Sequence, residues 1–119
     1  MKSLLFFLMT IPAMGFAQGN PAQGQKRFEE CAACHSLEAG KNILGPSLHG
    51  LFGRGAAEVP GFMYSPAMKR SGLRWTPQTL DAYIADPQKA VPTNRMPYAG
   101  MAEAQDRADL IAYLLQATK

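Results

Sequence analysis

The motif CAACH, from Cys31 to His35, contains the residues whose types and spacing most clearly suggest chemistry. Cys31 and Cys34 are the only cysteines of the chain. Four kinds of site use such a pair: a disulfide in an exported protein, a dithiol redox site, a zinc site, and covalent attachment of haem. A dithiol redox site normally follows a strand of a βαβ unit, which the sequence does not indicate. A zinc site would have to take His49, the only other histidine, as its fourth ligand, because no second cysteine pair exists.

Haem attachment uses the motif as it stands. Two thiols three positions apart at the end of a helix project to the same side, so each can add to one vinyl group of haem. The adjacent His35 then faces the iron as its proximal ligand. We therefore favour a single haem c held by two thioethers through Cys31 and Cys34, and keep the other three sites as alternatives.

An iron bound by His35 has a second axial position, for which Met96 is the first candidate. Met96 lies in the segment VPTNRMPYAG, residues 91–100, between two prolines. Because proline restricts the backbone, this segment can hold a soft thioether at a fixed distance from the metal. His49 and Met101 are the alternative ligands.

Residues 1–17 have the layout of a secretory signal peptide. A lysine precedes an apolar run from Leu4 to about Met14, and a small-x-Ala pattern ends at Ala17. The apolar run is too short to span a bilayer comfortably, and an uncleaved N-terminal anchor is the alternative. We expect an exported protein with a single domain over residues 18–119.

The composition limits the classes of binding partner and indicates what fills the centre of the domain. A formal net charge of +3, with scattered basic residues, gives no indication of nucleic-acid binding. Nine prolines and eleven glycines, many between Leu44 and Gly72, leave much irregular backbone in a short chain. We therefore expect something besides side-chain packing to help fill the centre of the domain.

Helix signals are clearer than strand signals, because no sustained alternation of apolar and polar residues predicts a strand. Three capping residues stand directly before prolines, at Asn20, Ser65 and Thr76. The last helix has no clear capping residue. The predicted helices cover residues 20–33, 65–72, 76–86 and 103–117, and the two long loops cover residues 40–61 and 87–102.

The chain resembles class I c-type cytochromes, specifically mitochondrial cytochrome c and its short periplasmic bacterial relatives. Besides CAACH, four segments carry the resemblance in the family's order: GPSLHGLFGR (45–54), PGFMYSPAM (60–68), RMPYAG (95–100) and RADLIAYL (107–114). Together they extend over nearly the whole region after the leader. The resemblance implies an all-α cytochrome c fold, with a few helices and long loops around one covalently bound haem.

The resemblance also implies roles for individual residues. His35 and Met96 would bind the iron, and the Pro46 carbonyl would accept a hydrogen bond from His35. The remaining residues of the haem environment would be Arg54, Tyr64 and Trp75 near a propionate, and Tyr83 beside the Met96 sulfur. Taken without the resemblance, Trp75 is a hydrophobic staple, Tyr83 a core residue and Arg54 a solvated loop charge. Gly24 and Phe28 would pack where the first and last helices cross, close to Tyr113.

Three positions depart from the family pattern. Met68 stands where many relatives have asparagine, and Asn94 where they have threonine. The hydrogen bonds on the methionine side are therefore not carried over from the family. Gln88 replaces one lysine of the usual docking ring, so we expect weaker or differently placed docking.

The resemblance implies a soluble, monomeric electron carrier rather than an enzyme. It would work in the periplasm, in transient contact with membrane complexes. Its partners would be quinol–cytochrome c reductase and a terminal oxidase, or a photosynthetic reaction centre or periplasmic dehydrogenase. Lys89, Arg95 and an exposed Tyr98 would form the docking rim. The alternatives are a haem enzyme, which requires that Met96 not be a ligand, and a dithiol oxidoreductase.

Overall fold

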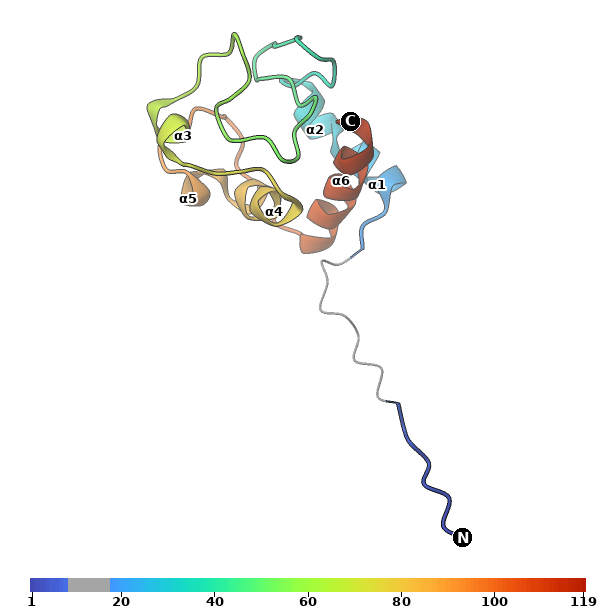
Figure 1. Cartoon of the computed structure of the whole chain (residues 1–119). Coiled ribbons are helices and arrows are strands. Elements are labelled where there is room, and N and C mark those ends of the chain that lie inside the picture. Colours follow the sequence, from blue (N-terminus) through green and yellow to red (C-terminus); the bar gives the residue numbers. More distant parts are fainter. Residues whose placement is uncertain (9–17) are drawn as a thin grey trace.

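The computed structural model describes residues 1–8 and 18–119, and the second of these ranges folds into one all-α body (Figure 1). Within the described residues there are six helices and no strand, apart from one isolated antiparallel bridge between Gly55 and Arg74. The predicted all-α class is therefore confirmed. The helices are α1 (Pro21–Arg27), α2 (Glu29–Ala32), α3 (Pro66–Arg70), α4 (Pro77–Ala85), α5 (Pro87–Ala90) and α6 (Ala104–Ala117).

Three helices begin where a capping residue precedes a proline, as predicted. The side chains of Asn20, Ser65 and Thr76 accept backbone N–H groups of the first turns of α1, α3 and α4. At α4 the cap is reciprocal, because Thr79 Oγ1 also accepts the Thr76 N–H at 2.9 Å. A side-chain cap of this kind contributes about 1 kcal/mol to stability.

The prediction of a continuous loop over residues 87–102 is wrong at its start. Pro87–Ala90 form the short helix α5, where the Asp86 carboxylate accepts the Lys89 N–H at 3.2 Å. Asp86 followed by Pro87 repeats the pattern, a capping residue before a proline, with which three other helices begin. Pro87 both ends α4 and begins α5, and only its first effect was predicted. The first predicted helix is also divided, since α1 ends at Arg27 and α2 begins at Glu29.

Helices α1 and α6 cross at close range, as predicted, and bring the two ends of the domain together (Figure 1). Gly24 lies directly on the backbone of Asp109, and a Cβ at this position would collide with the Asp109 carbonyl. The rings of Phe28 and Tyr113 pack with centroids 5.5 Å apart. The Asn20 N–H donates to the Asp109 carboxylate at 2.8 Å, which closes the crossing at the start of α1.

The apolar core is small and is centred on α4 and α6, with further residues from other segments: Phe28, Leu51, Trp75, Val91 and Met101. It contains Leu80, Tyr83 and Ile84 from α4, and Leu110, Ile111 and Leu114 from α6. Arg107 Nε donates to Asp81 at 2.8 Å at the edge of this contact. Residues of the two long loops pack against this core.

The predicted signal peptide and its cleavage site after Ala17 are only partly covered, because residues 9–17 lie outside the described residues. Residues 1–8 are exposed and belong to no helix. Among the helices that the structure describes, none has the length and apolar character needed to cross a bilayer.

Candidate haem site

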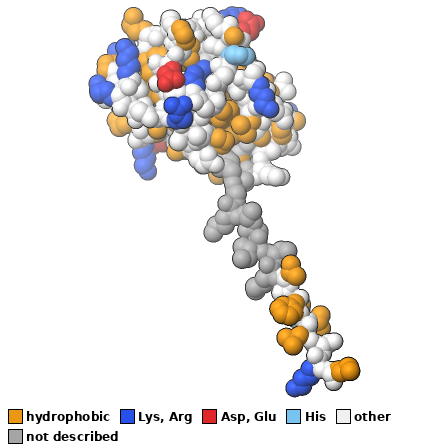
Figure 2. All heavy atoms as spheres, in the orientation of Figure 1, with side chains coloured by type: hydrophobic (Ala, Val, Ile, Leu, Met, Phe, Trp, Pro, Cys, Tyr) orange, Lys and Arg blue, Asp and Glu red, His pale blue; other side chains and the backbone are white. Residues whose placement is uncertain are grey.

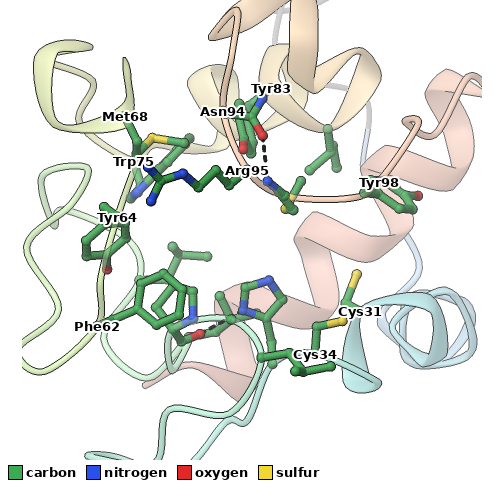
Figure 3. A pocket seen from close by; sticks show the side chains of 18 of the residues that line it. Cys31, Cys34, Phe62, Tyr64, Met68, Trp75, Tyr83, Asn94, Arg95 and Tyr98 are labelled. Carbon is green, nitrogen blue, oxygen red and sulfur yellow. Dashed lines mark hydrogen bonds between the residues drawn. The ribbon is translucent and has the colours of Figure 1, made fainter. Parts of the chain in front are cut away.

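A cavity of 530 Å³ lies between the helices and the two long loops. Its volume is in the range of small-molecule and cofactor sites. All the predicted site residues line it: Cys31, Cys34, His35, Pro46, Arg54, Tyr64, Trp75, Tyr83 and Met96. In Figure 3 the two cysteines lie on one side, while Tyr64 and Trp75 lie across the open space. The fold therefore gathers residues from distant parts of the chain around one hollow.

The cysteine pair sits where α2 ends. The Cys34 and His35 N–H groups both donate to the Cys31 carbonyl, at 3.1 and 2.9 Å. These bonds continue the helical turn, so both thiols reach the cavity, and no disulfide joins them. Burial, and then the Glu30 carboxylate, raise the pKa of Cys31 to about 11. This thiol is therefore protonated at neutral pH, whereas a dithiol redox site needs a thiolate.

His35 is held in one orientation. Its Nδ1 lies 2.7 Å from the Pro46 carbonyl, which has no proton to give, so Nδ1 donates and Nε2 is left as the ligating nitrogen. Gly45 packs on the ring, since a Cβ there would lie 2.8 Å from Nδ1 and 3.0 Å from Nε2. Burial lowers the pKa of His35, which favours the neutral imidazole that a metal requires.

Met96 enters the cavity wall from the segment between α5 and α6. Its N–H donates to Asn94 Oδ1 at 2.8 Å, and its carbonyl accepts the Tyr98 N–H at 2.8 Å. The backbone on both sides of the methionine is therefore fixed by hydrogen bonds. The alternative ligands lie elsewhere: His49 lines a second hollow of 340 Å³, and Met101 is buried in the core.

The far side of the cavity supplies polar groups to a mainly apolar wall. Arg54 donates to the carbonyls of His49 and Ser47, at 2.8 and 3.2 Å. The Tyr64 hydroxyl accepts the Val59 N–H at 3.2 Å, so its own proton stays available. Trp75 also lines the cavity, and its indole N–H is a donor. A cation and two donors therefore face the same space, as an acidic cofactor edge requires.

Tyr83 packs against Trp75 with ring centroids 5.2 Å apart. Burial raises the pKa of the Tyr83 hydroxyl to about 12, so this group is neutral under ordinary conditions. In Figure 3 Tyr83 lies beside Asn94, on the side of the cavity that the Met96 segment closes. Tyr83 is therefore both a core residue and part of the cavity wall.

The donor set fits a haem better than a bare metal ion. Over residues 1–8 and 18–119, no group of three or more His, Cys, Asp or Glu side chains is placed to hold a metal. The cavity wall instead offers one imidazole, a thioether and two thiols, from His35, Met96, Cys31 and Cys34. An iron bound by so few donors needs the nitrogen ligands of a macrocycle, which haem supplies.

One prediction about the rim is wrong. Tyr98 was expected to be exposed, but it is half-buried and its hydroxyl donates to Glu30 at 2.8 Å. Lys89 and Arg95 are exposed, as expected. The contact with Glu30 joins residues 68 positions apart. No local pattern in the sequence signals it.

Helices folded around an apolar cavity, with a Cys-x-x-Cys-His motif on its wall, define a c-type haem protein. The model of the family described as cytochrome c matches residues 21–118. The chain is 44% identical to a cytochrome c of Cochliobolus lunatus over 108 residues, 89% of this chain and all of the relative. It is 40% identical to a cytochrome c2 of Blastochloris viridis over 119 residues, 98% of this chain and 94% of the relative.

A cytochrome c2 of Rhodopila globiformis is 46% identical over 97 residues, 81% of this chain and 92% of the relative. The chain belongs to the cytochrome c family. Members of this family carry covalently attached haem c with its iron, and they are electron carriers rather than enzymes. The predictions of the family, the cofactor and the non-enzymatic role are therefore confirmed.

Proposed function

We propose that this protein carries single electrons between periplasmic or membrane-bound redox partners, with His35 and Met96 as the two protein ligands of its haem iron. Cys31 and Cys34 would form the two thioether links. The observation that carries the proposal is that all four residues line one cavity. When bound, the haem supplies an iron that alternates between the ferrous and ferric states.

The choice of Met96 as sixth ligand rests on its position in the cavity wall and in the sequence. His49 and Met101 do not line the 530 Å³ cavity, whereas Met96 does. Two other methionines also line the cavity: Met63 is largely exposed, and Met68 lies within 4.0 Å of the Ser71 hydroxyl at the end of α3. The backbone of Met68 is hydrogen-bonded as well, because its N–H donates to Ser65 Oγ at 3.0 Å and its carbonyl accepts the Ser71 N–H at 3.2 Å. Met96 is preferred because it lies in the segment RMPYAG, which resembles the segment that carries the methionine ligand in the family.

The cavity wall explains how the chain would tune electron transfer. A soft thioether favours ferrous iron and raises the reduction potential. The Pro46 carbonyl fixes His35 and makes it a better donor. The mainly apolar wall limits the water that must reorient when the charge on the iron changes. Arg54, Tyr64 and Trp75 would bind an anionic edge of the cofactor and hold it in place.

The leader supports the proposed compartment, and the rim supports docking to redox partners. Residues 1–17 would direct export to the periplasm, leaving one domain over residues 18–119. On the face seen in Figure 2, the basic side chains are scattered among apolar ones. Lys89 and Arg95 would make weak, salt-sensitive contacts that let a shuttle leave quickly.

The candidate partners are quinol–cytochrome c reductase with a terminal oxidase, a photosynthetic reaction centre, or a periplasmic dehydrogenase.

The spectrum of the purified ferric holoprotein tests the proposal. We expect a low-spin spectrum with a weak far-red sulfur-to-iron band and slow binding of cyanide. Met96→Ala should remove the band and admit cyanide rapidly, while the control Met101→Leu should keep the band. A wild-type protein that is high-spin and binds cyanide at once would overturn the assignment of Met96. It would favour a haem protein with an open sixth site.

A further inference from the structure

The segment that carries Met96 leaves α5 through a strained turn. Thr93 has φ 67°, and it is one of two non-glycine residues with positive φ in the described chain. A β-branched residue rarely adopts this left-handed conformation, because its side chain crowds the backbone. Such a conformation persists only where surrounding contacts determine it. Two amide side chains, of Gln88 and Asn94, make such contacts with residues 91–96.

The Gln88 side chain supplies the first contacts. Its Oε1 accepts the Thr93 N–H at 3.0 Å, and its Nε2 donates to the Asn94 carbonyl at 3.0 Å. One amide thus uses its acceptor and one donor on two consecutive residues of the strained turn. Because Gln88 belongs to α5, these bonds attach the turn to the helix that precedes it.

The Asn94 side chain supplies the second set of contacts. It is only 7% exposed, and its Nδ2 donates to the carbonyls of Pro87 and Val91, at 2.9 and 3.0 Å. Its Oδ1 accepts the Met96 N–H at 2.8 Å. The buried amide therefore connects the first residue of α5 directly to the backbone of the methionine.

We propose that Gln88 and Asn94 form an amide clamp that positions Met96 in the cavity and controls how readily an external ligand replaces it. This role rests on the proposed function, in which the Met96 sulfur binds iron. The two side chains touch the backbone around Met96 rather than the iron, so they are positioning residues. Both amides act as donor and acceptor at once, which an ionised carboxylate cannot do.

If the clamp positions Met96, its loss should change the rate at which an external ligand binds more than it changes the stability of the fold. Release of Met96 requires the turn to move away from α5, which breaks the bonds of the clamp. Loss of the donor of Gln88, an exposed side chain, should favour the open form a fewfold. Loss of the donors of the buried Asn94 leaves the carbonyls of Pro87 and Val91 without their partner and should favour the open form roughly tenfold. The binding rate of imidazole to the ferric holoprotein should rise by about the same factor.

The experiment compares two charge-matched variants of the full holoprotein. Gln88→Glu keeps the acceptor for the Thr93 N–H but cannot donate to the Asn94 carbonyl. Gln78→Glu makes the same change on an exposed side chain of α4. We expect faster imidazole binding and a weaker far-red sulfur-to-iron band for Gln88→Glu alone. Asn94→Asp should have the larger effect, because it loses two donors.

A third variant separates positioning from general stability. Asp109→Asn weakens the crossing of α1 and α6 without touching the clamp, so it should lower the midpoint of thermal unfolding and leave imidazole binding unchanged. The proposal is overturned if Gln88→Glu and Asn94→Asp lose stability but bind imidazole at the wild-type rate. Failure of the proposed function would look different, because the wild-type protein itself would then lack the far-red band.

Discussion

The hydroxyl of Tyr98 donates a hydrogen bond of 2.8 Å to the carboxylate of Glu30, across 68 positions of the sequence. Tyr98 belongs to the segment of Met96, and Glu30 directly precedes Cys31 on α2. The contact therefore joins the two sides of the cavity at its rim. Burial raises the pKa of Tyr98, and the bond to Glu30 raises it further, so the phenol stays protonated and remains a donor.

Tyr98→Phe should lower the free energy of unfolding by about 1 kcal/mol, because the ring packing remains and one hydrogen bond is lost. Chemical denaturation of the holoprotein measures this loss. Glu30→Gln keeps an oxygen acceptor and should cost less than Glu30→Ala. In a double-mutant cycle, Tyr98→Phe and Glu30→Ala should show a clear coupling energy. Strictly additive effects would mean that the contact contributes nothing in solution.

Gly45→Ala should disturb the ligand side of the haem through His35. The added Cβ would lie 2.5 Å from Cε1 of the ring, which forces the imidazole to shift relative to the Pro46 carbonyl. We expect a lower yield of holoprotein and a change in reduction potential, because both the orientation and the donor strength of the ligand depend on that bond. Ala33→Ser, at an exposed position of the same motif, is the control. A wild-type reduction potential for Gly45→Ala would contradict this prediction, because it would show that the imidazole accommodates the added Cβ without a change in its ligand properties.

Asp109 should make folding sensitive to acid. The hydrogen bond from the Asn20 N–H, and then that from Gln105, lower the pKa of this carboxyl below 3.8. The folded state therefore prefers the carboxylate, and the unfolded state takes up a proton more readily. The resulting stabilisation is fully present above the unfolded pKa and is lost as the pH falls through the folded pKa.

Asp109→Asn should lower the free energy of unfolding by about 1 kcal/mol at neutral pH and flatten its decline in acid. Urea denaturation at pH 7 and pH 3 measures both effects. Asp106→Asn, which removes a surface ion pair of 3.1 Å with Arg27, should change stability much less. An unchanged acid profile for Asp109→Asn would assign the acid sensitivity to other carboxyl groups.

Local chemistry explains which parts of the structure could be predicted from the sequence. Caps such as Asn20 and Thr76 act on the turn that follows them, so a few adjacent residues reveal them. The CAACH motif is likewise local, and it leads directly to the cavity. The contacts of Tyr98 with Glu30 and of Asn94 with Pro87 are different. Each joins a helix to a loop residue, and the position of that loop residue is set by the path of the irregular backbone. No periodic pattern in the sequence predicts the path of such a loop. These loop-to-helix contacts are the ones that hold the segment of Met96.

The exposed cations at Lys89 and Arg95 should govern electron exchange with charged reagents. Arg95 also lines the cavity, so its charge lies where an electron would enter or leave the haem. Arg95→Gln should slow oxidation by the anion ferricyanide and speed oxidation by a tripositive cobalt complex, each by roughly two- to fivefold at low ionic strength. Both differences should shrink as salt is added.

Lys26→Gln, on α1 and outside the cavity wall, is the matched control and should change neither rate appreciably. Opposite signs for the two reagents identify the electrostatic origin of the effect, because a structural disturbance at the haem would change both rates in one direction. Equal slowing with both reagents would therefore contradict a role for Arg95 in docking. It would indicate instead that the substitution disturbs the neighbouring Met96.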